Sequence, residues 1–343
     1  MGRVIAFEES RRVGIVEYED SILGADEVRV QTLFSGISAG TELTAYRGSN
    51  PYLSKRWDEK QRVFRDDTAS FSYPIEGWGY EEVGQIVERG RDVGAVAEGD
   101  VVWGAWGHRT THIMTEQDAA SRLLEPGIDP LNGVFSQIAA IALNSVLDAD
   151  IHVGEFVAVF GQGVPGLIAM QLARNNGARV IAVDRIPHRR EISSRLGADY
   201  VIDAPAAAET IKELTGGRGA DVCIELSGVY PALHEAIRAV AYNSRVVASG
   251  FFQGGGSALF LGEEFHHNRV EVVCSQISGV SPRLDHRWSE ARLRSTVMAL
   301  QAEGRIDFES LVSHVFSFED AAQAFELLDE RAAETVQVVL AYK

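Results

Sequence analysis

The sequence predicts an α/β protein in which a doubly wound parallel sheet is joined to a second, mostly β domain. Three observations predict it. A strand, a glycine-rich turn, a helix and a second strand follow one another between Glu155 and Asp184. Alternating strands and helices continue to about residue 279, which indicates βαβ units with right-handed crossovers. Short strands separated by glycine-rich turns occupy roughly the first 130 residues, a pattern typical of a β domain.

The glycine-rich turn has the fingerprint of a dinucleotide site. The apolar strand Phe156–Phe160 leads into a GQGVPG segment, and a helical pattern follows. Gly161 permits a tight turn, Gly163 lets a pyrophosphate approach the backbone, and Gly166 lets the helix pack on the strand. The helix N-terminus that follows offers N–H groups to phosphates. Pro165 in the turn has no N–H, but Gly163 and Val164 still donate. We therefore expect a Rossmann dinucleotide-binding domain rather than an ordinary tight turn.

The acid that closes this unit bears on the choice of cofactor. Asp184 follows the strand Val180–Val183, where a carboxylate accepts hydrogen bonds from ribose hydroxyls and repels a 2′-phosphate. NAD is therefore favoured. Arg185 could instead receive the phosphate of NADP if the aspartate turned away. Arg189 and Arg190 are interpreted as the solvated start of the next helix.

The remaining elements predict the domain limits. In the dinucleotide domain we expect a helix at Ala232–Ala241 and strands at Tyr200–Asp203, Asp221–Glu225, Arg245–Gly250 and Val270–Ser275. Ser227 follows one of these strands, at the carboxyl edge where such sheets bind ligands. The tail has helical patterns at Leu293–Leu300 and Ala321–Leu328 and a strand at Val336–Ala341. We expect it to return to the β domain, giving domains 1–134 with 280–343 and 135–279, separated by a cleft.

Composition excludes several classes of protein. The chain has 343 residues and a formal net charge of −17, which argues against nucleic acid and anionic membranes as partners. Its N-terminus lacks the apolar core of a signal peptide, and we expect no membrane-spanning run. Cys223 and Cys274 lie in strand-like apolar runs and are interpreted as buried thiols of a reducing compartment. These features predict a cytoplasmic protein with a small-molecule substrate.

Several segments carry a resemblance to a known family. Ser35–Leu43 reads SGISAGTEL, Gly79–Gly84 reads GYEEVG and Gly99–Val102 reads GDVV. They are similar to the SGICGTDL, GHExxG and GDRV segments of the medium-chain dehydrogenase/reductase family, and the similarity covers nearly the whole chain. The resemblance implies an alcohol dehydrogenase-like enzyme whose β domain is GroES-like. It also implies a homodimer, because Val270–Ser275 resembles the family's interface strand.

The chain departs from that family at the zinc ligands. The family's cysteine corresponds to Ser38 or Ala39, its histidine to Tyr80, and the glutamate of polyol-type members to Gln137. Neutral hydroxyl and amide groups are poor zinc ligands. The family's four-cysteine lobe is absent as well. We therefore expect no zinc, and the motifs most resemble those of the zinc-free bacteriochlorophyllide hydroxyethyl dehydrogenase branch.

Without a metal, another group must stabilise the oxygen that gains charge as hydride moves. Tyr80 is the first candidate, since it takes a ligand position and its phenol both donates and accepts; a packed ring filling the metal's space is the alternative. Glu81 is expected to tune this tyrosine, to shuttle a proton, or to form a salt bridge. Thr41 matches the hydroxyl that relays protons in zinc-containing relatives. Ser38 completes the catalytic set and, with Gln137, faces the substrate.

Two further features are candidate parts of a substrate site. A metal site made by His108, His112 and Glu81 is the less favoured hypothesis, and His108 is instead expected to pack or to line the substrate site. The segment 48–74 is longer than in the family and mixes basic residues with aromatic ones, Trp57 among them. It could hold an anionic or aromatic substrate, or it could be a surface excursion or dimer contact.

These observations predict a zinc-independent oxidoreductase that transfers hydride between NAD(H) and a secondary alcohol or ketone. In the family, the strand that ends near Gly250 meets the nicotinamide, so backbone groups of Gly250 and Phe251 are expected contacts. The first alternative is an NADPH-dependent quinone or enoyl reductase. The second, of another class, is a nucleotide-binding redox sensor or structural subunit without turnover.

Overall fold

The structure, a computed structural model, describes residues 1–343 and divides into two compact units. Unit 1 comprises residues 1–137 and 312–343, and unit 2 comprises residues 138–311. The sequence analysis assigned residues 280–311 to the first domain, whereas they group with unit 2. The reason is local: Gln171 exchanges two hydrogen bonds with the backbone of Asp307 (2.8 and 3.2 Å), and Asn175 donates to the carbonyl of Arg305 (2.8 Å).

Unit 2 contains a six-stranded parallel sheet with the strand order β12-β11-β10-β13-β14-β15. This is the order of a Rossmann sheet, and the direction of winding reverses between β10 and β13. The strands are β10 (Phe156–Phe160), β11 (Arg179–Val183), β12 (Tyr200–Ile202), β13 (Ala220–Glu225), β14 (Val240–Ala248) and β15 (Glu271–Cys274). The predicted doubly wound parallel sheet is confirmed.

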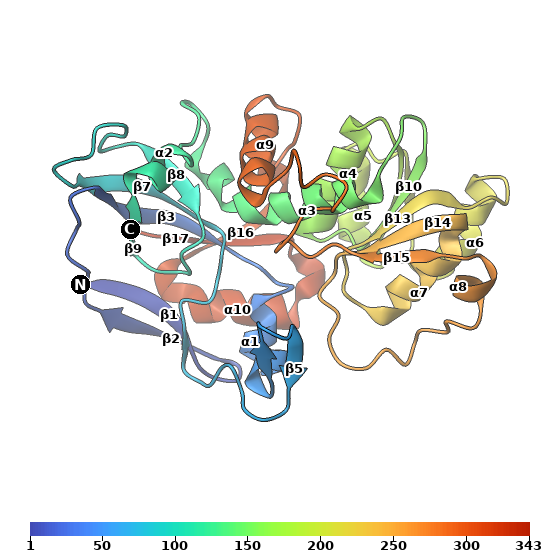
Figure 1. The fold of residues 1–343 in the computed structure, drawn as a ribbon, viewed down its shortest axis with the longest axis horizontal. Helices are drawn as coiled ribbons and strands as arrows, with labels where there is room; N and C mark the ends of the chain where they lie inside the picture. Colours follow the sequence, from blue (N-terminus) through green and yellow to red (C-terminus); the bar gives the residue numbers. More distant parts are fainter. The chain divides into compact units, whose positions relative to one another are not determined.

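Helices cover both faces of this sheet (Figure 1). On one face, apolar side chains of α6 and α7 pack against alternate strand residues such as Phe160, Ile181 and Val246. Side chains of the intervening strand residues point to the other face, where α4 packs against β10 and β11. The helices are α3 (Ser136–Ala149), α4 (Val164–Asn175), α5 (Pro187–Arg195), α6 (Ala207–Leu214), α7 (Tyr230–Ala239), α8 (Glu264–His267) and α9 (Glu290–Ala302).

Unit 1 is mostly β, as predicted. Its main sheet has the order β16-β17-β3-β7-β8, with β9 also pairing with β3, and a second sheet has the order β2-β1-β6. Its strands are β1 (Gly2–Glu9), β2 (Arg12–Tyr18), β3 (Glu27–Ile37), β4 (Arg56–Asp58), β5 (Val63–Arg65), β6 (Ile75–Glu76), β7 (Glu82–Arg89), β8 (Val101–Gly104), β9 (Thr111–Thr115), β16 (Val312–Ser317) and β17 (Gln337–Ala341). Its helices are α1 (Glu42–Arg47), α2 (Glu116–Ala120) and α10 (Ala321–Glu330).

The core of unit 1 is built on one long strand. Strand β3 pairs with β7, β9 and β17, so it brings distant parts of the chain together. Beside it, α1 and α10 bury a cluster that includes Leu43, Tyr46 and Phe325. Because β3 ends at Ile37 and α1 begins at Glu42, the short turn between them is held on both sides by this core.

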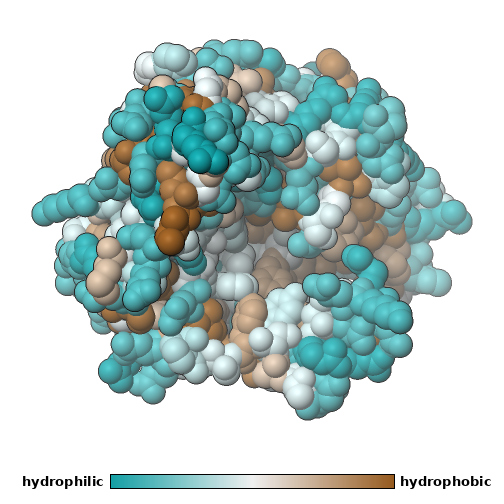
Figure 2. All heavy atoms as spheres, turned by 60° about the vertical axis from the view of Figure 1, so that its left-hand side comes forward, coloured by the Kyte–Doolittle hydropathy of each residue, from teal (hydrophilic) through white to brown (hydrophobic).

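Two expectations about the surface and membrane need correction. Cys223 is buried as predicted, but Cys274 is exposed, because it ends β15 at the edge of the sheet. The helical stretch Pro130–Ala149 is long and apolar enough to cross a membrane, although the sequence analysis expected no such run; 78% of its apolar window is buried inside the structure, as in a core helix. The face seen in Figure 2 is largely hydrophilic with scattered apolar groups.

Candidate functional site

The glycine-rich turn joins β10 to α4 at the reversal point of the unit 2 sheet. Gly161 has a φ of 88°, which side chains disfavour, and a Cβ on Gly166 would overlap the Gly161 carbonyl oxygen. At Gly163 a Cβ would meet nothing closer than 3.9 Å. The first and third glycines are therefore required by packing, whereas the middle one leaves open space through which a phosphate can reach the backbone.

Asp184 lies at the same edge of the sheet and braces the turn. Its side chain is 7% exposed, and its two carboxylate oxygens accept hydrogen bonds from the backbone N–H groups of Gln162 (2.6 Å) and Ile186 (2.8 Å). A charge-assisted bond of this kind is stronger than a neutral one. Asp184 therefore fixes the shape of the turn at the end of β11.

The three arginines that follow are not equivalent. Arg185 is exposed. Arg190, expected to be solvated, is partly buried and donates to the carbonyl of Asp184 (2.7 Å) and to the carboxylate of Asp203 (3.1 Å). Arg189 is partly buried too, and burial lowers its pKa although the nearby Asp184 charge raises it. The Arg189 guanidinium is also the group nearest to a Cβ placed on Gly163, so it lies beside the turn.

Strand β13 ends beside the turn in a buried acid that the sequence analysis did not single out. Glu225 accepts hydrogen bonds from the N–H of Ser227 (2.8 Å), the Ser227 hydroxyl and the N–H of Gly228 (3.2 Å). Its backbone carbonyl accepts from the N–H groups of Ser249 (2.9 Å) and Gly250 (3.0 Å). Burial raises the pKa of the Glu225 carboxyl to about 7, and the hydrogen bonds from Ser227 partly oppose this rise. Glu225 therefore joins two loops where cofactor contacts were expected.

The same loops are packed too tightly for side chains. A Cβ on Gly250 would overlap the backbone of Gly228, and one on Gly228 would come within 3.1 Å of backbone atoms of Phe251. Ser227 lies against Gly161, because a Cβ placed on Gly161 would come within 2.8 Å of Ser227. The structure thus brings the predicted cofactor residues of three loops to one edge of the sheet.

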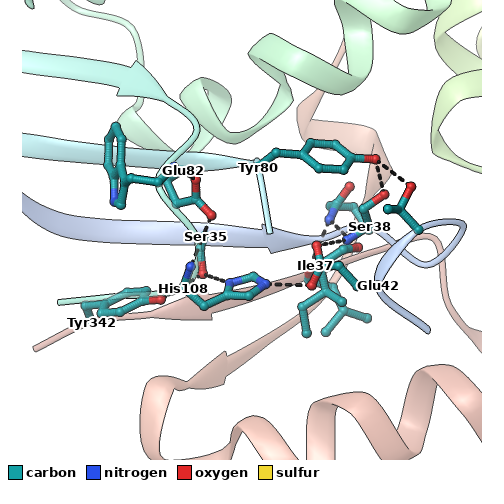
Figure 3. Close-up of polar contacts among 12 residues, drawn as sticks. Ser35, Ile37, Ser38, Glu42, Tyr80, Glu82, His108 and Tyr342 are labelled. Atoms are coloured by element: carbon teal, nitrogen blue, oxygen red, sulfur yellow. Dashed lines mark hydrogen bonds and ion pairs between the residues drawn. The ribbon is translucent and has the colours of Figure 1, made fainter. Parts of the chain in front are cut away.

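In unit 1 the structure brings Tyr80 together with two of the other predicted catalytic residues. The Tyr80 hydroxyl forms a short hydrogen bond with the Ser38 hydroxyl and a longer one with the Thr41 hydroxyl (3.3 Å), as Figure 3 shows. Burial raises the pKa of the Tyr80 phenol, and the charge of the adjacent Glu81 raises it further. The phenol is therefore neutral at physiological pH and can donate a proton or a hydrogen bond.

A buried network lies behind this pair. The Glu42 carboxylate accepts a hydrogen bond from the backbone N–H of Ser38 (2.9 Å) and lies 2.6 Å from Nε2 of His108. The other ring nitrogen of His108 lies 2.7 Å from the Ser35 hydroxyl, which in turn lies 3.0 Å from the Tyr342 hydroxyl (Figure 3). Glu42 thus links His108 to the backbone of Ser38, the residue whose hydroxyl contacts Tyr80.

Of the two roles expected for His108, the structure agrees with packing and not with lining a substrate site. Its side chain and that of Glu42 are both 0% exposed. Burial lowers the pKa of His108, but the charge and hydrogen bond of Glu42 outweigh this and raise it overall. His108 and Glu42 accordingly form a buried ion pair. In the sequence, Glu42 stood out only as part of the segment Ser35–Leu43. The one signal of its role is that an acid lies in the turn between β3 and α1, where a buried carboxylate needs a partner.

Two further buried carboxyl groups surround this pair. Glu82 accepts hydrogen bonds from the N–H groups of Trp106 (2.5 Å) and His108 (3.2 Å), and burial raises its pKa. Glu81 is also 0% exposed, and neither of its carboxyl oxygens has a hydrogen-bond partner. Burial raises its pKa well above the ordinary value, and the neighbouring carboxylates add to this. Glu81 forms no salt bridge, so no cation offsets the cost of burying its carboxyl group.

The positions that bind zinc in the resembling family hold a donor set that does not fit the metal. Zinc needs thiolate, imidazole or carboxylate ligands. Ser38 and Tyr80 supply neutral hydroxyl groups that already bond to each other, and the raised pKa of the phenol opposes ionisation. Gln137, at the start of α3, supplies a neutral amide and is partly buried. His112, in the less favoured metal hypothesis, stacks on Trp106 with ring centroids 5.3 Å apart, and burial lowers its pKa to about 4.

Trp57, the last predicted substrate-lining residue, lies in β4 and packs against Phe64 of β5 (ring centroids 4.9 Å apart). The long segment thus forms an ordered hairpin. Three of its five basic residues are paired with acids of the same segment: Lys55 with Asp66, Arg56 with Asp67 and Arg65 with Asp58.

Comparisons with known proteins define the class. The chain is 33% identical over 339 residues to D-guloside 3-dehydrogenase of Escherichia coli K12, covering 96% of both chains. It is 28% identical over 368 residues to L-threonine 3-dehydrogenase of Pyrococcus horikoshii, covering 96% of this chain and 95% of the relative. Sorbitol dehydrogenase of Halalkalibacterium halodurans is 23% identical over 355 residues, with 92% of both chains covered.

Solved structures share the fold over the full length. A zinc-binding dehydrogenase of Sinorhizobium meliloti 1021, bound to NADP, has a TM-score of 0.78 at 22% identity, with 99% of both chains covered. An alcohol dehydrogenase of Escherichia coli CFT073, complexed with NADH, has a TM-score of 0.76 at 21% identity, again over 99% of both chains.

The fold and the glycine-rich turn define an oxidoreductase of the dehydrogenase class. The chain belongs to the medium-chain dehydrogenase/reductase superfamily, and within it is an alcohol dehydrogenase-like oxidoreductase. The family model described as zinc-binding dehydrogenase matches residues 165–293. That range contains neither Ser38, Tyr80 nor Gln137, so the match carries no information on the metal-ligand positions.

Proposed function

We propose that this protein is a zinc-independent, NAD-preferring dehydrogenase that interconverts a secondary alcohol of a polyol or glycoside and the corresponding ketone. The observation that carries the proposal is the pair of Tyr80 and Ser38, two hydroxyl groups bonded to each other where zinc-dependent relatives bind the metal. The dehydrogenases of D-guloside and sorbitol among its relatives support the substrate class.

Tyr80 is the group that handles the substrate's proton. When bound, the nicotinamide ring supplies the hydride acceptor or donor. In ketone reduction, the neutral phenol of Tyr80 donates a hydrogen bond to the carbonyl oxygen and then its proton, and Thr41 or Ser38 replaces that proton. In alcohol oxidation the steps reverse: the substrate's hydroxyl proton passes to the tyrosine oxygen, the phenol proton moves to the Ser38 or Thr41 hydroxyl, and that hydroxyl releases its own proton to solvent water. In ketone reduction, water supplies the proton that restores this hydroxyl.

The buried groups behind Tyr80 hold it in the proton-donating state. The carboxyl of Glu81 and the pair formed by Glu42 with His108 surround the turn that carries Ser38. Any negative charge there disfavours a phenolate, so ketone reduction benefits most from this arrangement. Glu81 acts by raising the pKa of the Tyr80 phenol rather than by exchanging a proton with it, because the two side chains share no hydrogen bond.

The preference for NAD rests on Asp184. Its side chain is held at the end of β11 by hydrogen bonds from two backbone N–H groups, where a carboxylate repels a 2′-phosphate. Arg189 beside Gly163 partly offsets this charge, and Arg185 is exposed. An NADPH-dependent reductase is the second candidate that these arginines favour.

Substitution of Tyr80 tests the catalytic assignment. Tyr80→Phe removes the phenolic proton and keeps the ring, so we expect kcat to fall by about 10²-fold or more while the Kd for NADH stays the same. Tyr73→Phe is the matched control, because the Tyr73 hydroxyl bonds only to the Ala45 carbonyl. Equal activity in both variants would overturn the role of Tyr80.

Metal analysis tests the zinc assignment separately. We expect no stoichiometric zinc in the purified protein and unchanged turnover after prolonged treatment with a chelator. One bound zinc per chain whose removal abolishes turnover would overturn zinc independence but leave the dehydrogenase assignment intact.

A further inference from the structure

We propose that the hairpin β4–β5 and the residues that flank it form an aromatic platform that binds the sugar ring of a glycoside substrate. The proposal rests on the proposed function, since it names a binding subsite of the same enzyme. It uses residues 51–78, the long segment to which the resemblance assigns no role.

The hairpin has one aromatic face and one charged face. Trp57 and Phe64 are directly opposite each other in the antiparallel pair, so their side chains lie on the same face. The flanking pairs, Arg56 with Arg65 and Asp58 with Val63, point to the other face, because side chains alternate along a strand. Phe64 keeps 39% of its surface exposed although a neighbouring ring packs on it.

Five rings form a continuous series within unit 1. Neighbouring ring centroids lie 4.9, 5.5, 5.1 and 4.8 Å apart in the order Trp57, Phe64, Tyr52, Phe71 and Trp78. The last ring belongs to the residue two positions before Tyr80. It also packs against the core cluster that holds α1. Trp78, at the inner end of the series, is therefore fixed to the same core as the turn that carries Ser38 and Thr41. Phe64, near the outer end, is exposed.

The charges of the hairpin do not suit an anionic ligand. Each of Lys55, Arg56 and Arg65 has an acidic partner within the segment. Residues 51–78 as a whole carry five basic side chains and five acidic ones, so the segment has no net charge that would attract a phosphate or carboxylate. What remains exposed is aromatic surface beside polar groups, and the electron-rich face of an aromatic ring attracts the polarised C–H groups on one face of a sugar ring.

The size of the series also favours a sugar ring over a small alcohol. Neighbouring rings span several ångströms of surface, so a short diol held at Tyr80 would not extend over the outer rings. A glycoside carries a ring and an aglycone, and both extend from the hydroxyl that reacts. The proposed platform therefore affects glycosides and leaves small secondary alcohols unaffected.

Matched variants of one hairpin test the platform. Trp57→Ala and Phe64→Ala remove rings from the aromatic face, and Val63→Ala is the control, since Val63 is 41% exposed on the charged face. We expect the Kd of a methyl hexopyranoside, measured by calorimetry, to rise about three- to tenfold in each aromatic variant, the range of one aromatic contact. The control, the Kd for NADH, and the KM for butane-2,3-diol should not change.

The outcomes separate the platform from the proposed function. Unchanged glycoside binding in the aromatic variants, or equal weakening in all three, would overturn the platform. Wild-type protein that binds aromatic alcohols but no glycoside would overturn the sugar assignment. In each case the Tyr80→Phe comparison on a small secondary alcohol still decides the proposed function. Calorimetry needs no turnover, so an inactive preparation still gives a result for the platform.

Discussion

Glu225 offers a test of the dinucleotide domain that does not depend on any ligand. This carboxyl is 0% exposed, has hydroxyl and N–H partners but no cation, and has a pKa raised by burial to about 7 from an ordinary value of 4.5. Below pH 4.5 the group is protonated in both the folded and the unfolded chain. As the pH rises to 7, the unfolded chain releases this proton and the folded chain keeps it, so the free energy of unfolding falls.

The size of this loss follows from the shift. A difference of 2.5 pKa units, at 1.36 kcal/mol per unit, corresponds to about 3 kcal/mol, present in full above pH 7. Glu225→Gln does not titrate. Relative to wild type, the variant should therefore gain about 3 kcal/mol between pH 4.5 and 7.5, or roughly 6–12 °C in Tm for a domain of this size.

The assay is the Tm of both proteins at half-unit steps from pH 4.5 to 8.5, taken as a difference so that all other titrating groups cancel. A flat difference for Glu225→Gln would mean that this buried carboxyl titrates normally and would refute the reasoning. A difference that falls with rising pH would refute its sign.

Three further predictions concern other residues. His108→Gln leaves a buried carboxylate without its cation, so the free energy of unfolding from urea denaturation should fall by about 3–5 kcal/mol; a loss under 1 kcal/mol would contradict the ion pair. Asp184→Ala should shift the ratio of NADH to NADPH affinity, from fluorescence titration, about tenfold toward NADPH, and an unchanged ratio would remove the basis of the NAD preference. Gly166→Ala should lower both Tm and NADH affinity, because its Cβ overlaps Gly161, whereas Gly163→Ala should weaken NADH binding at unchanged Tm; equal Tm losses in both would contradict the packing argument.

The dinucleotide domain could be predicted from sequence because its signals are local. The strand Phe156–Phe160 has the same bounds in the prediction and in the structure, and the helix begins at Val164 directly after the turn. Glycine positions and apolar periodicity encode such a unit within about 30 residues. Glu225 was overlooked because nothing in the sequence distinguishes a buried strand-end acid from a solvated one.

The candidate catalytic site could be predicted only in part. A resemblance to three short segments was enough to single out Tyr80, Ser38 and Thr41, which the structure brings into contact. The buried ion pair was not predictable, because its partners His108 and Glu42 are 66 residues apart and meet only through the pairing of β3 with its neighbours. A histidine in a loop after a short strand has the same sequence pattern whether it faces substrate or a buried acid.

The proposed zinc independence and the proposed aromatic platform can be understood together. A Lewis acid supplies several kcal/mol of stabilisation to an alkoxide, whereas a single oxyanion donor such as Tyr80 supplies a factor of about 10²–10³. The positive charge of His108 does not supply the missing stabilisation of the alkoxide, because the adjacent Glu42 carboxylate compensates that charge. An enzyme of this design must therefore take more of its rate from holding the substrate in place, and binding energy from remote parts of the substrate can be used for that purpose. A platform of five rings that begins two residues from the catalytic tyrosine can supply such energy. On this argument, Trp57→Ala should lower kcat/KM for glycosides and leave the slow turnover of a small diol unchanged.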